Sequence, residues 1–171
     1  MNKRNQWSFP MLAMSLALCL PSLAHAQVSA TEPAARNMAE MKFSPIPGLP
    51  TCASGSVQTG DPAKGAFIIL AKLATGCSIP WHWHTAGEDL MIVSGTGRIE
   101  MKDGPSRTLQ AGSFVLLPSH HVHQFLCKKN CTFFFYSDGA FDIHYLDKQG
   151  AEISPDEALK AVKEKAAKAM K

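Results

Sequence analysis

At residues 76–95 the chain reads GCSIPWHWHTAGEDLMIVSG, and two histidines and a glutamate lie close together in it. Side chains two positions apart on a β-strand point to the same face, so His82 and His84 project together. The short segment over residues 85–87 can turn the chain and place Glu88 at the start of a neighbouring strand. Two imidazoles and a carboxylate on adjacent strands predict a binding site for one metal ion.

A fourth ligand is expected from a second stretch, GSFVLLPSHHVHQF, at residues 112–125. His121 and His123 have the same strand parity, so the residues alone leave both as candidates. Unpaired polar side chains inside a β-barrel would be costly to bury, and a bound metal removes that cost.

The rest of the chain predicts an all-β domain. Short apolar or β-branched runs separated by turn residues recur at intervals of roughly ten residues, which is typical of a sandwich or barrel. We expect a barrel over residues 61–147, preceded by an arm and loop over 27–60 that holds at most one edge strand. The expected strands are 66–73, 78–84, 89–93, 98–101, 113–117, 122–127, 132–136 and 141–146.

Both stretches resemble the paired motifs of the cupin superfamily. The first motif, G-x5-H-x-H-x3-E-x6-G, is matched by Gly76, His82, His84, Glu88 and Gly95. The second, G-x5-P-x-G-x2-H-x3-N, is matched by Gly112, Pro118 and His123, and departs from the pattern at His120 and Cys127. The resemblance implies a small antiparallel barrel of the double-stranded β-helix (jelly-roll) type. It also implies His82, His84, Glu88 and His123 as the metal ligands, and a homodimer.

The N-terminus has the pattern of a secretory signal peptide. Lys3 and Arg4 stand near its start, an apolar stretch follows over residues 9–23, and Ala24-His25-Ala26 ends the segment. We expect residues 1–26 to be removed, leaving a periplasmic protein that starts at Gln27 and has no stable association with a membrane. An uncleaved anchor is the alternative, but the apolar stretch is short for a bilayer.

Four of the five cysteines lie after residue 26, which predicts disulfides in an oxidising compartment. Cys127 and Cys131 flank Lys128-Lys129-Asn130, which has the composition of a hairpin turn and would bring the two thiols within bonding reach. Cys52 and Cys77 are then the remaining pair. Free buried thiols are the alternative, and zinc binding is a weaker one.

The C-terminal stretch over residues 154–170 predicts a helix. Ser154 is placed as its N-cap, Pro155 as its first residue and Glu157 as the partner in a capping box. The whole chain has 17 basic and 14 acidic residues, and two of the basic ones lie in the leader. This near balance gives no reason to expect nucleic acid as a partner.

Three histidines and one carboxylate leave coordination positions open, which is typical of a catalytic or ligand-binding metal site. The expected function is a metal-dependent dioxygenase, isomerase or lyase for a small organic molecule, with Fe, Mn, Zn, Ni or Cu as the ion. A non-catalytic module that binds or senses a small molecule is the alternative. His121, expected near the barrel mouth, is the candidate for proton transfer.

Overall fold

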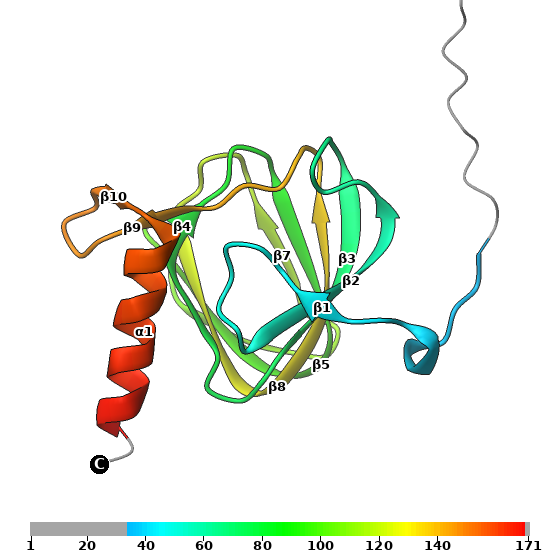
Figure 1. Ribbon diagram of the computed structural model, residues 1–171, viewed down its shortest axis with the longest axis horizontal. Coiled ribbons are helices and arrows are strands. Elements are labelled where there is room, and N and C mark those ends of the chain that lie inside the picture. Colours follow the sequence, from blue (N-terminus) through cyan, green and yellow to red (C-terminus); the bar gives the residue numbers. More distant parts are fainter. Residues whose placement is uncertain (1–33, 170–171) are drawn as a thin grey trace, which may run out of the picture. The chain divides into compact units, whose positions relative to one another are not determined.

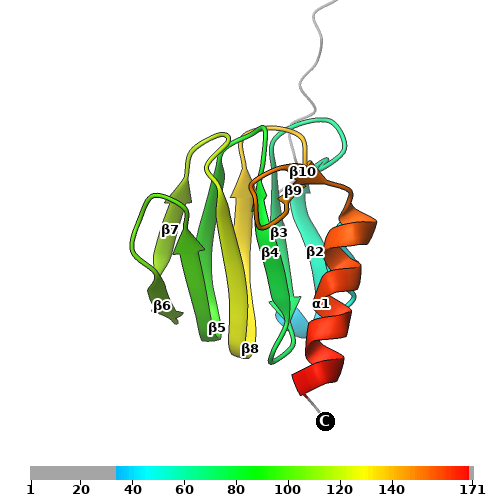
Figure 2. The same ribbon diagram turned by 90° about the vertical axis from the view of Figure 1, so that its left-hand side faces the viewer.

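Two long strands, β5 (Glu88–Met101) and β8 (His123–Ser137), organise the antiparallel barrel seen in a computed structural model that describes residues 34–169 (Figures 1 and 2). They pair with each other from Glu88 opposite Ser137 to Met101 opposite His123. The register shifts between Ile92 and Gly97, where both strands bend. Each strand therefore contributes one half to each side of the barrel.

The remaining strands extend the two sides in the order expected for a jelly roll. One side runs β1-β2-β3-β8-β5-β7, and the other runs β10-β9-β4-β8-β5-β6. The elements not yet given are η1 (Met38–Glu40), β1 (Ser44–Pro45), β2 (Ala53–Gly60), β3 (Phe67–Leu73), β4 (Ser78–Trp83), β6 (Arg107–Gln110), β7 (Phe114–Leu117), β9 (His144–Leu146), β10 (Glu152–Ile153) and α1 (Pro155–Ala169).

Alternation along the strands fills the barrel with apolar side chains. In β3 and β8, alternate residues such as Phe67, Ile69, Phe133 and Phe135 are at most 5% exposed and belong to one core. The Phe67 and Phe135 rings meet edge to face with centroids 5.2 Å apart. This period-two burial is the pattern from which the sequence predicts strands, and it confirms the all-β fold.

One predicted reversal of the chain is wrong. Residues 128–130 were predicted to close a hairpin, but β8 continues through them. Asn130 has φ +25°, and the partner strand has Gly95 at φ +87° in the matching bend. These two residues let both strands curve around the barrel corner instead of turning back.

The predicted disulfides are nevertheless both present. Cys127 and Cys131 flank the bulge with their Cα atoms 5.7 Å apart, and Cys52 pairs with Cys77 at the same Cα separation. Cys77 and Cys127 also share a backbone hydrogen bond, from the Cys127 amide to the Cys77 carbonyl at 2.9 Å. The two bridges thus lie at one end of the barrel.

Two strands and a two-residue edge strand occur where the residues show little β-strand pattern. The stretch over residues 43–60, predicted to be mostly loop, contains β1 and the eight-residue β2. β2 is built largely from Gly, Ser and Thr, and Gly55 has no room for a side chain between Ile46 and Ile69. β6 was also missed, because Leu109 is its one buried residue.

The C-terminal helix begins as predicted. The Glu157 carboxylate accepts from the Ser154 amide at 3.0 Å, and the Ser154 hydroxyl accepts from the Glu157 amide at 3.3 Å, which completes the capping box. Ala158 is 3% exposed and Leu159 packs against the barrel core. No helix within residues 34–169 has the length and apolar character to cross a bilayer. The predicted signal peptide lies outside the described residues.

Candidate metal site

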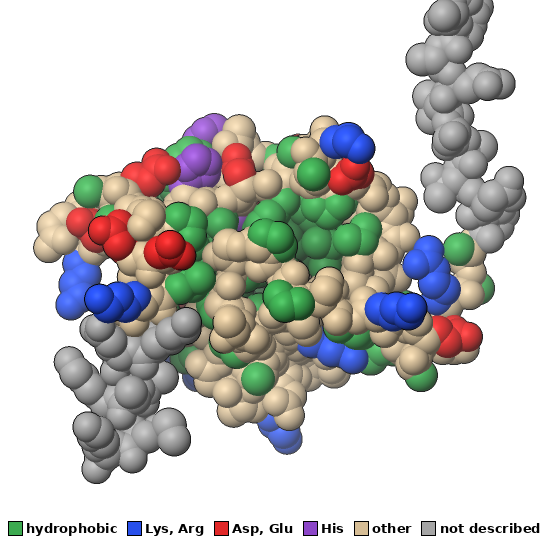
Figure 3. Space-filling model, viewed as in Figure 1, with side chains coloured by type: hydrophobic (Ala, Val, Ile, Leu, Met, Phe, Trp, Pro, Cys, Tyr) green, Lys and Arg blue, Asp and Glu red, His purple; other side chains and the backbone are tan. Residues whose placement is uncertain are grey.

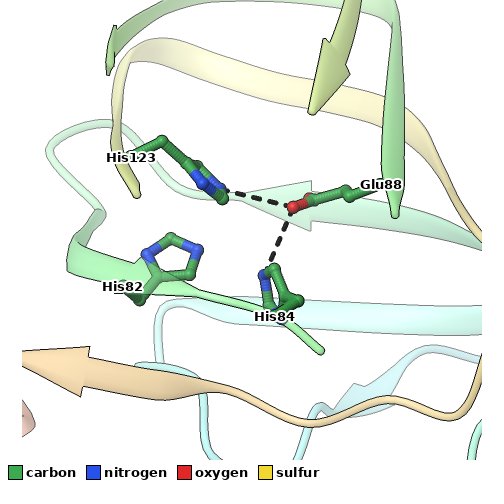
Figure 4. A group of neighbouring side chains, drawn as sticks. All are labelled: His82, His84, Glu88 and His123. Atoms are coloured by element: carbon green, nitrogen blue, oxygen red, sulfur yellow. Dashed lines mark ion pairs between the residues drawn. The ribbon is translucent and has the colours of Figure 1, made fainter. Parts of the chain in front are cut away.

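Four polar side chains converge inside the barrel near its open end (Figure 4). His82 lies near the end of β4 and His84 directly follows that strand, while Glu88 and His123 are the first residues of β5 and β8. His82 is paired directly with His123 across the β4–β8 ladder. One possible ligand atom from each of the four residues lies within 4.8 Å of the others, and all four are buried.

Backbone carbonyls fix the orientation of all three imidazoles. Nδ1 of His82 donates to the Pro80 carbonyl at 2.6 Å, and Nδ1 of His123 donates to the His121 carbonyl at 2.9 Å. Nδ1 of His84 donates to the Asp142 carbonyl. A carbonyl oxygen can only accept, so Nδ1 of each ring carries the proton and each neutral ring presents the lone pair of Nε2.

The Glu88 carboxylate faces these lone pairs. Its Oε2 lies 3.2 Å from Nε2 of His84 and 3.3 Å from Nε2 of His123. Despite these short distances, Oε2 has no partner in hydrogen-bond geometry among the described residues. A buried cluster of acceptors without a donor requires a shared cation or an added proton. Nitrogen and oxygen donors of this kind suit a divalent transition metal.

The pKa values show where a proton resides when no metal is bound. Burial and the imidazoles of His123 and His84 hold the pKa of His82 well below its usual value. Burial also acts to lower the pKa of His84, but the Glu88 carboxylate outweighs it and the pKa of His84 is raised. Burial acts to raise the pKa of Glu88, yet His123 and His84 bring it below its usual value. His84 therefore accepts a proton more readily than His82 does.

We expect metal binding at pH 6 to release protons, because His84 must become neutral to coordinate. The raised pKa of His84 means that metal affinity increases as the pH is raised through that pKa. Calorimetric titration of Zn²⁺ into the apo protein, in two buffers of different protonation enthalpy, measures the release. An enthalpy independent of the buffer at pH 6 would contradict this assignment.

The four side chains open onto a small apolar cavity of about 30 Å³. Its other lining residues are four phenylalanines and six aliphatic residues: Phe125, Phe133, Phe135, Phe141, Ile46, Leu49, Ala71, Leu73, Ile79 and Leu90. Apolar side chains also gather at the open end of the barrel seen in Figure 3. The cavity is large enough to hold water or part of a small molecule next to the cluster.

The structure distinguishes between His121 and His123, which the alternation of side chains along a strand left as alternative ligands. His123 belongs to the cluster, and His121 neither joins it nor lines the cavity. His121 contributes its carbonyl to orient His123, while its own Nε2 is buried without a partner among the described residues. Its predicted role in proton transfer stays a prediction.

His120 occupies the position at which the second motif has glycine. Its φ of +61° is in the left-handed region that glycine favours, so the backbone keeps the shape of the motif with a different residue. The His120 ring stacks on Trp83 with centroids 4.6 Å apart. Trp83 also stacks on His144, whose Nδ1 donates to Glu152 at 2.7 Å. These rings therefore have packing and hydrogen-bonding roles.

Sequence reasoning missed the segment that holds the turn between His84 and Glu88. Asp142 accepts from the Thr85 amide at 2.9 Å, and Asp138 accepts from the Gly87 amide at 2.8 Å. The Asp142 carbonyl is also the partner of His84. These contacts join residues more than fifty positions apart, so no local pattern could have indicated them.

One comparison with known proteins gives a family for the central part of the barrel. Residues 69–137 match the Cupin domain family, and this range includes all four cluster residues. Among curated proteins, none matches the sequence.

Solved structures of similar fold are distant in sequence. An RmlC-like cupin protein from Ralstonia eutropha is 18% identical, with a TM-score of 0.55 over 78% of this chain and 87% of that chain. KdgF from Halomonas sp. is 16% identical, with a TM-score of 0.51 over 60% and 92% of the two chains. The DMSP lyase DddQ from Ruegeria pomeroyi is 18% identical, with a TM-score of 0.51 over 68% and 61%. At these identities the likeness shows the fold.

Proposed function

Because this chain belongs to the cupin superfamily, we propose that it is a metal-dependent enzyme that acts on a small organic molecule. The observation that carries the proposal is the buried cluster of His82, His84, Glu88 and His123, in which Nε2 lone pairs and a carboxylate face one another without a donor. The cluster opens onto a cavity, as a site for a ligand or substrate must.

The four side chains would hold one divalent ion of Fe, Mn, Zn, Ni or Cu. Such an ion supplies a Lewis acid for isomerase or lyase chemistry, or, if it is iron, a centre for dioxygenase chemistry. The chain itself orients the three imidazoles through backbone carbonyls and surrounds the reacting region with apolar walls. Excluding water in this way strengthens the electrostatic interactions inside the cavity.

Elemental analysis of protein purified from its native compartment tests the metal, and we expect about one ion per chain, as a single cluster of four ligands requires. Molecules that raise the melting temperature of this protein are then assayed for turnover, with an oxygen electrode separating oxygenation from isomerisation or elimination. Native protein without any transition metal would contradict the proposal.

A non-catalytic binding or sensing module is the second candidate. It is favoured by the absence, among the described residues that line the cavity, of any acid–base side chain besides the four in the cluster. Ligands that stabilise the protein and are recovered unchanged would support this function over an enzyme.

Export to the periplasm is part of the proposal. Its support is the signal-peptide pattern of residues 1–26 together with the two disulfides, which form in oxidising compartments. N-terminal sequencing of the exported protein is expected to begin at Gln27. A chain that retains Met1 in the membrane fraction would contradict cleavage.

A homodimer is also proposed, on the evidence of the outer face of β5 and β7. Phe114 and Leu116 are 58% and 61% exposed, and Met91 lies opposite Phe114 across the ladder. Exposed apolar side chains that lie together mark interaction surfaces. Light scattering is expected to give a dimer mass for the wild type and a monomer mass for Leu116→Lys. Leu126→Lys, on β8, is the matched control and should remain dimeric.

A further inference from the structure

The walls of the cavity offer nothing to a polar ligand except the cluster itself. Of its lining residues, only His82, His84, Glu88 and His123 have a side chain that can form hydrogen bonds. A hydroxyl or amide placed anywhere else in the cavity would lose its water partners and gain none from a side chain. The lining therefore disfavours sugars and other polyhydroxylated molecules.

The net charge of the site also limits the class of ligand that fits it. Glu88 binds an ion as a carboxylate, so it contributes one negative charge to the loaded site. A divalent cation held there gives the site a net charge of about +1, and no other lining side chain is ionisable apart from the imidazoles that bind the ion. A monoanion brings the buried charge to zero, whereas a dianion leaves an uncompensated negative charge next to apolar walls.

Aromatic side chains beside the cluster offer a place for the apolar part of such a ligand. The ring centroids of Phe141 and Phe135 lie 5.7 and 6.3 Å from that of His84. Phe133 and Phe135 are at most 5% exposed, whereas Phe141 and Leu49, which also line the cavity, are only partly buried. A molecule that binds the metal through one oxygen group would therefore direct its hydrocarbon part along these side chains.

We propose that this site selects a small monoanionic oxygen donor, such as a short monocarboxylate, whose remaining atoms are apolar. The inference rests on the proposed metal site and adds the ligand class to it. Each polar group beyond the metal-binding one should weaken binding by about tenfold, the effect expected for one unsatisfied buried hydroxyl.

The test uses the full mature protein loaded with Co²⁺, whose visible absorption bands change when a ligand enters the coordination shell. Three acids of matched length are titrated: pentanoate, 4-hydroxybutyrate and glutarate. Pentanoate is expected to change the bands with an affinity about tenfold higher than 4-hydroxybutyrate, which has a hydroxyl in place of its terminal methyl group. Glutarate, a dianion, is expected to bind more weakly than pentanoate.

A matched pair of variants at Ile79 links the preference to the cavity wall. Ile79 is 7% exposed and lines the cavity. Ile79→Val and Ile79→Thr lose comparable volume, but only the threonine adds a hydroxyl. Ile79→Thr should narrow the difference between pentanoate and 4-hydroxybutyrate, and Ile79→Val should preserve it.

The outcomes separate the two levels of the proposal. If the protein binds about one Co²⁺ but 4-hydroxybutyrate or glutarate binds as tightly as pentanoate, the ligand class is wrong and the metal site stands. The ligand class is also wrong if all three acids bind equally tightly, or if none of them changes the absorption bands of the Co²⁺ protein. If the wild-type protein does not retain Co²⁺, the metal site fails and the ligand class fails with it.

Discussion

Alanine at any one of the four cluster residues is expected to weaken metal binding by about 100-fold or more. Each residue supplies one direct bond, and removing even a supporting residue around a metal typically costs between about tenfold and 100-fold in affinity. The remaining three side chains would also be left as buried polar groups with an incomplete partner. Bound metal per chain, measured after identical purification of His82→Ala, His84→Ala, Glu88→Ala and His123→Ala, checks the expectation.

His121→Ala is the matched control for this series. The contact of His121 with the site is through its backbone carbonyl, which accepts from Nδ1 of His123 and survives the substitution. The variant should therefore retain most of its metal, while any effect on turnover would reveal the predicted proton-transfer role. Full metal in His123→Ala combined with loss in His121→Ala would show that the fourth ligand is wrong.

Removing the Cys52–Cys77 bridge is expected to lower the free energy of unfolding by about 3 kcal/mol, and removing the Cys127–Cys131 bridge by about 2 kcal/mol or less. A disulfide that closes a longer loop removes more conformational entropy from the unfolded chain. The Cys52–Cys77 bridge spans a sequence separation of 25 and the Cys127–Cys131 bridge one of 4, so the first should stabilise the protein more. Urea unfolding of the two double serine variants, with the metal removed by a chelator, measures both effects.

Neither substitution should change the metal content of the folded protein. Cys77 lies just before β4 and His82 near its end, so along an extended strand the bridge and the site are separated by roughly 15 Å. A larger loss of stability for the short loop would contradict the chain-entropy explanation. If a serine variant folds fully but loses its metal, the disulfides and the metal site are not independent, and this expectation is wrong.

The convergence of the four cluster residues could be predicted from the sequence because it depends largely on local rules. Strand parity places His82 and His84 on one face, and a three-residue turn brings Glu88 back beside them. His123 required the motif, since parity alone could not distinguish it from His121. The capping box of Ser154 and Glu157 is equally local, and the structure confirms it.

The features that the sequence could not predict depend on the closed barrel. The stretch over residues 94–97 and the Lys128-Lys129-Asn130 segment have the composition of turns, but the pairing of β5 with β8 converts them into bends of continuous strands. β2 has little apolar character of its own and is defined by its pairing with β3. Asp142 reaches His84 only after the chain has folded around the barrel.

The position of the cluster on two sides of the barrel has a thermodynamic consequence. Glu88 begins the half of β5 that pairs with β7, whereas His82 and His123 pair with each other on the opposite side. An ion bound to all of them would link the two sides in the native state, and the unfolded chain has no such arrangement. By mass action, free metal at 100 times its dissociation constant would add about 2.7 kcal/mol to stability. Excess metal should therefore raise the melting temperature of the protein, and a chelator should lower it again.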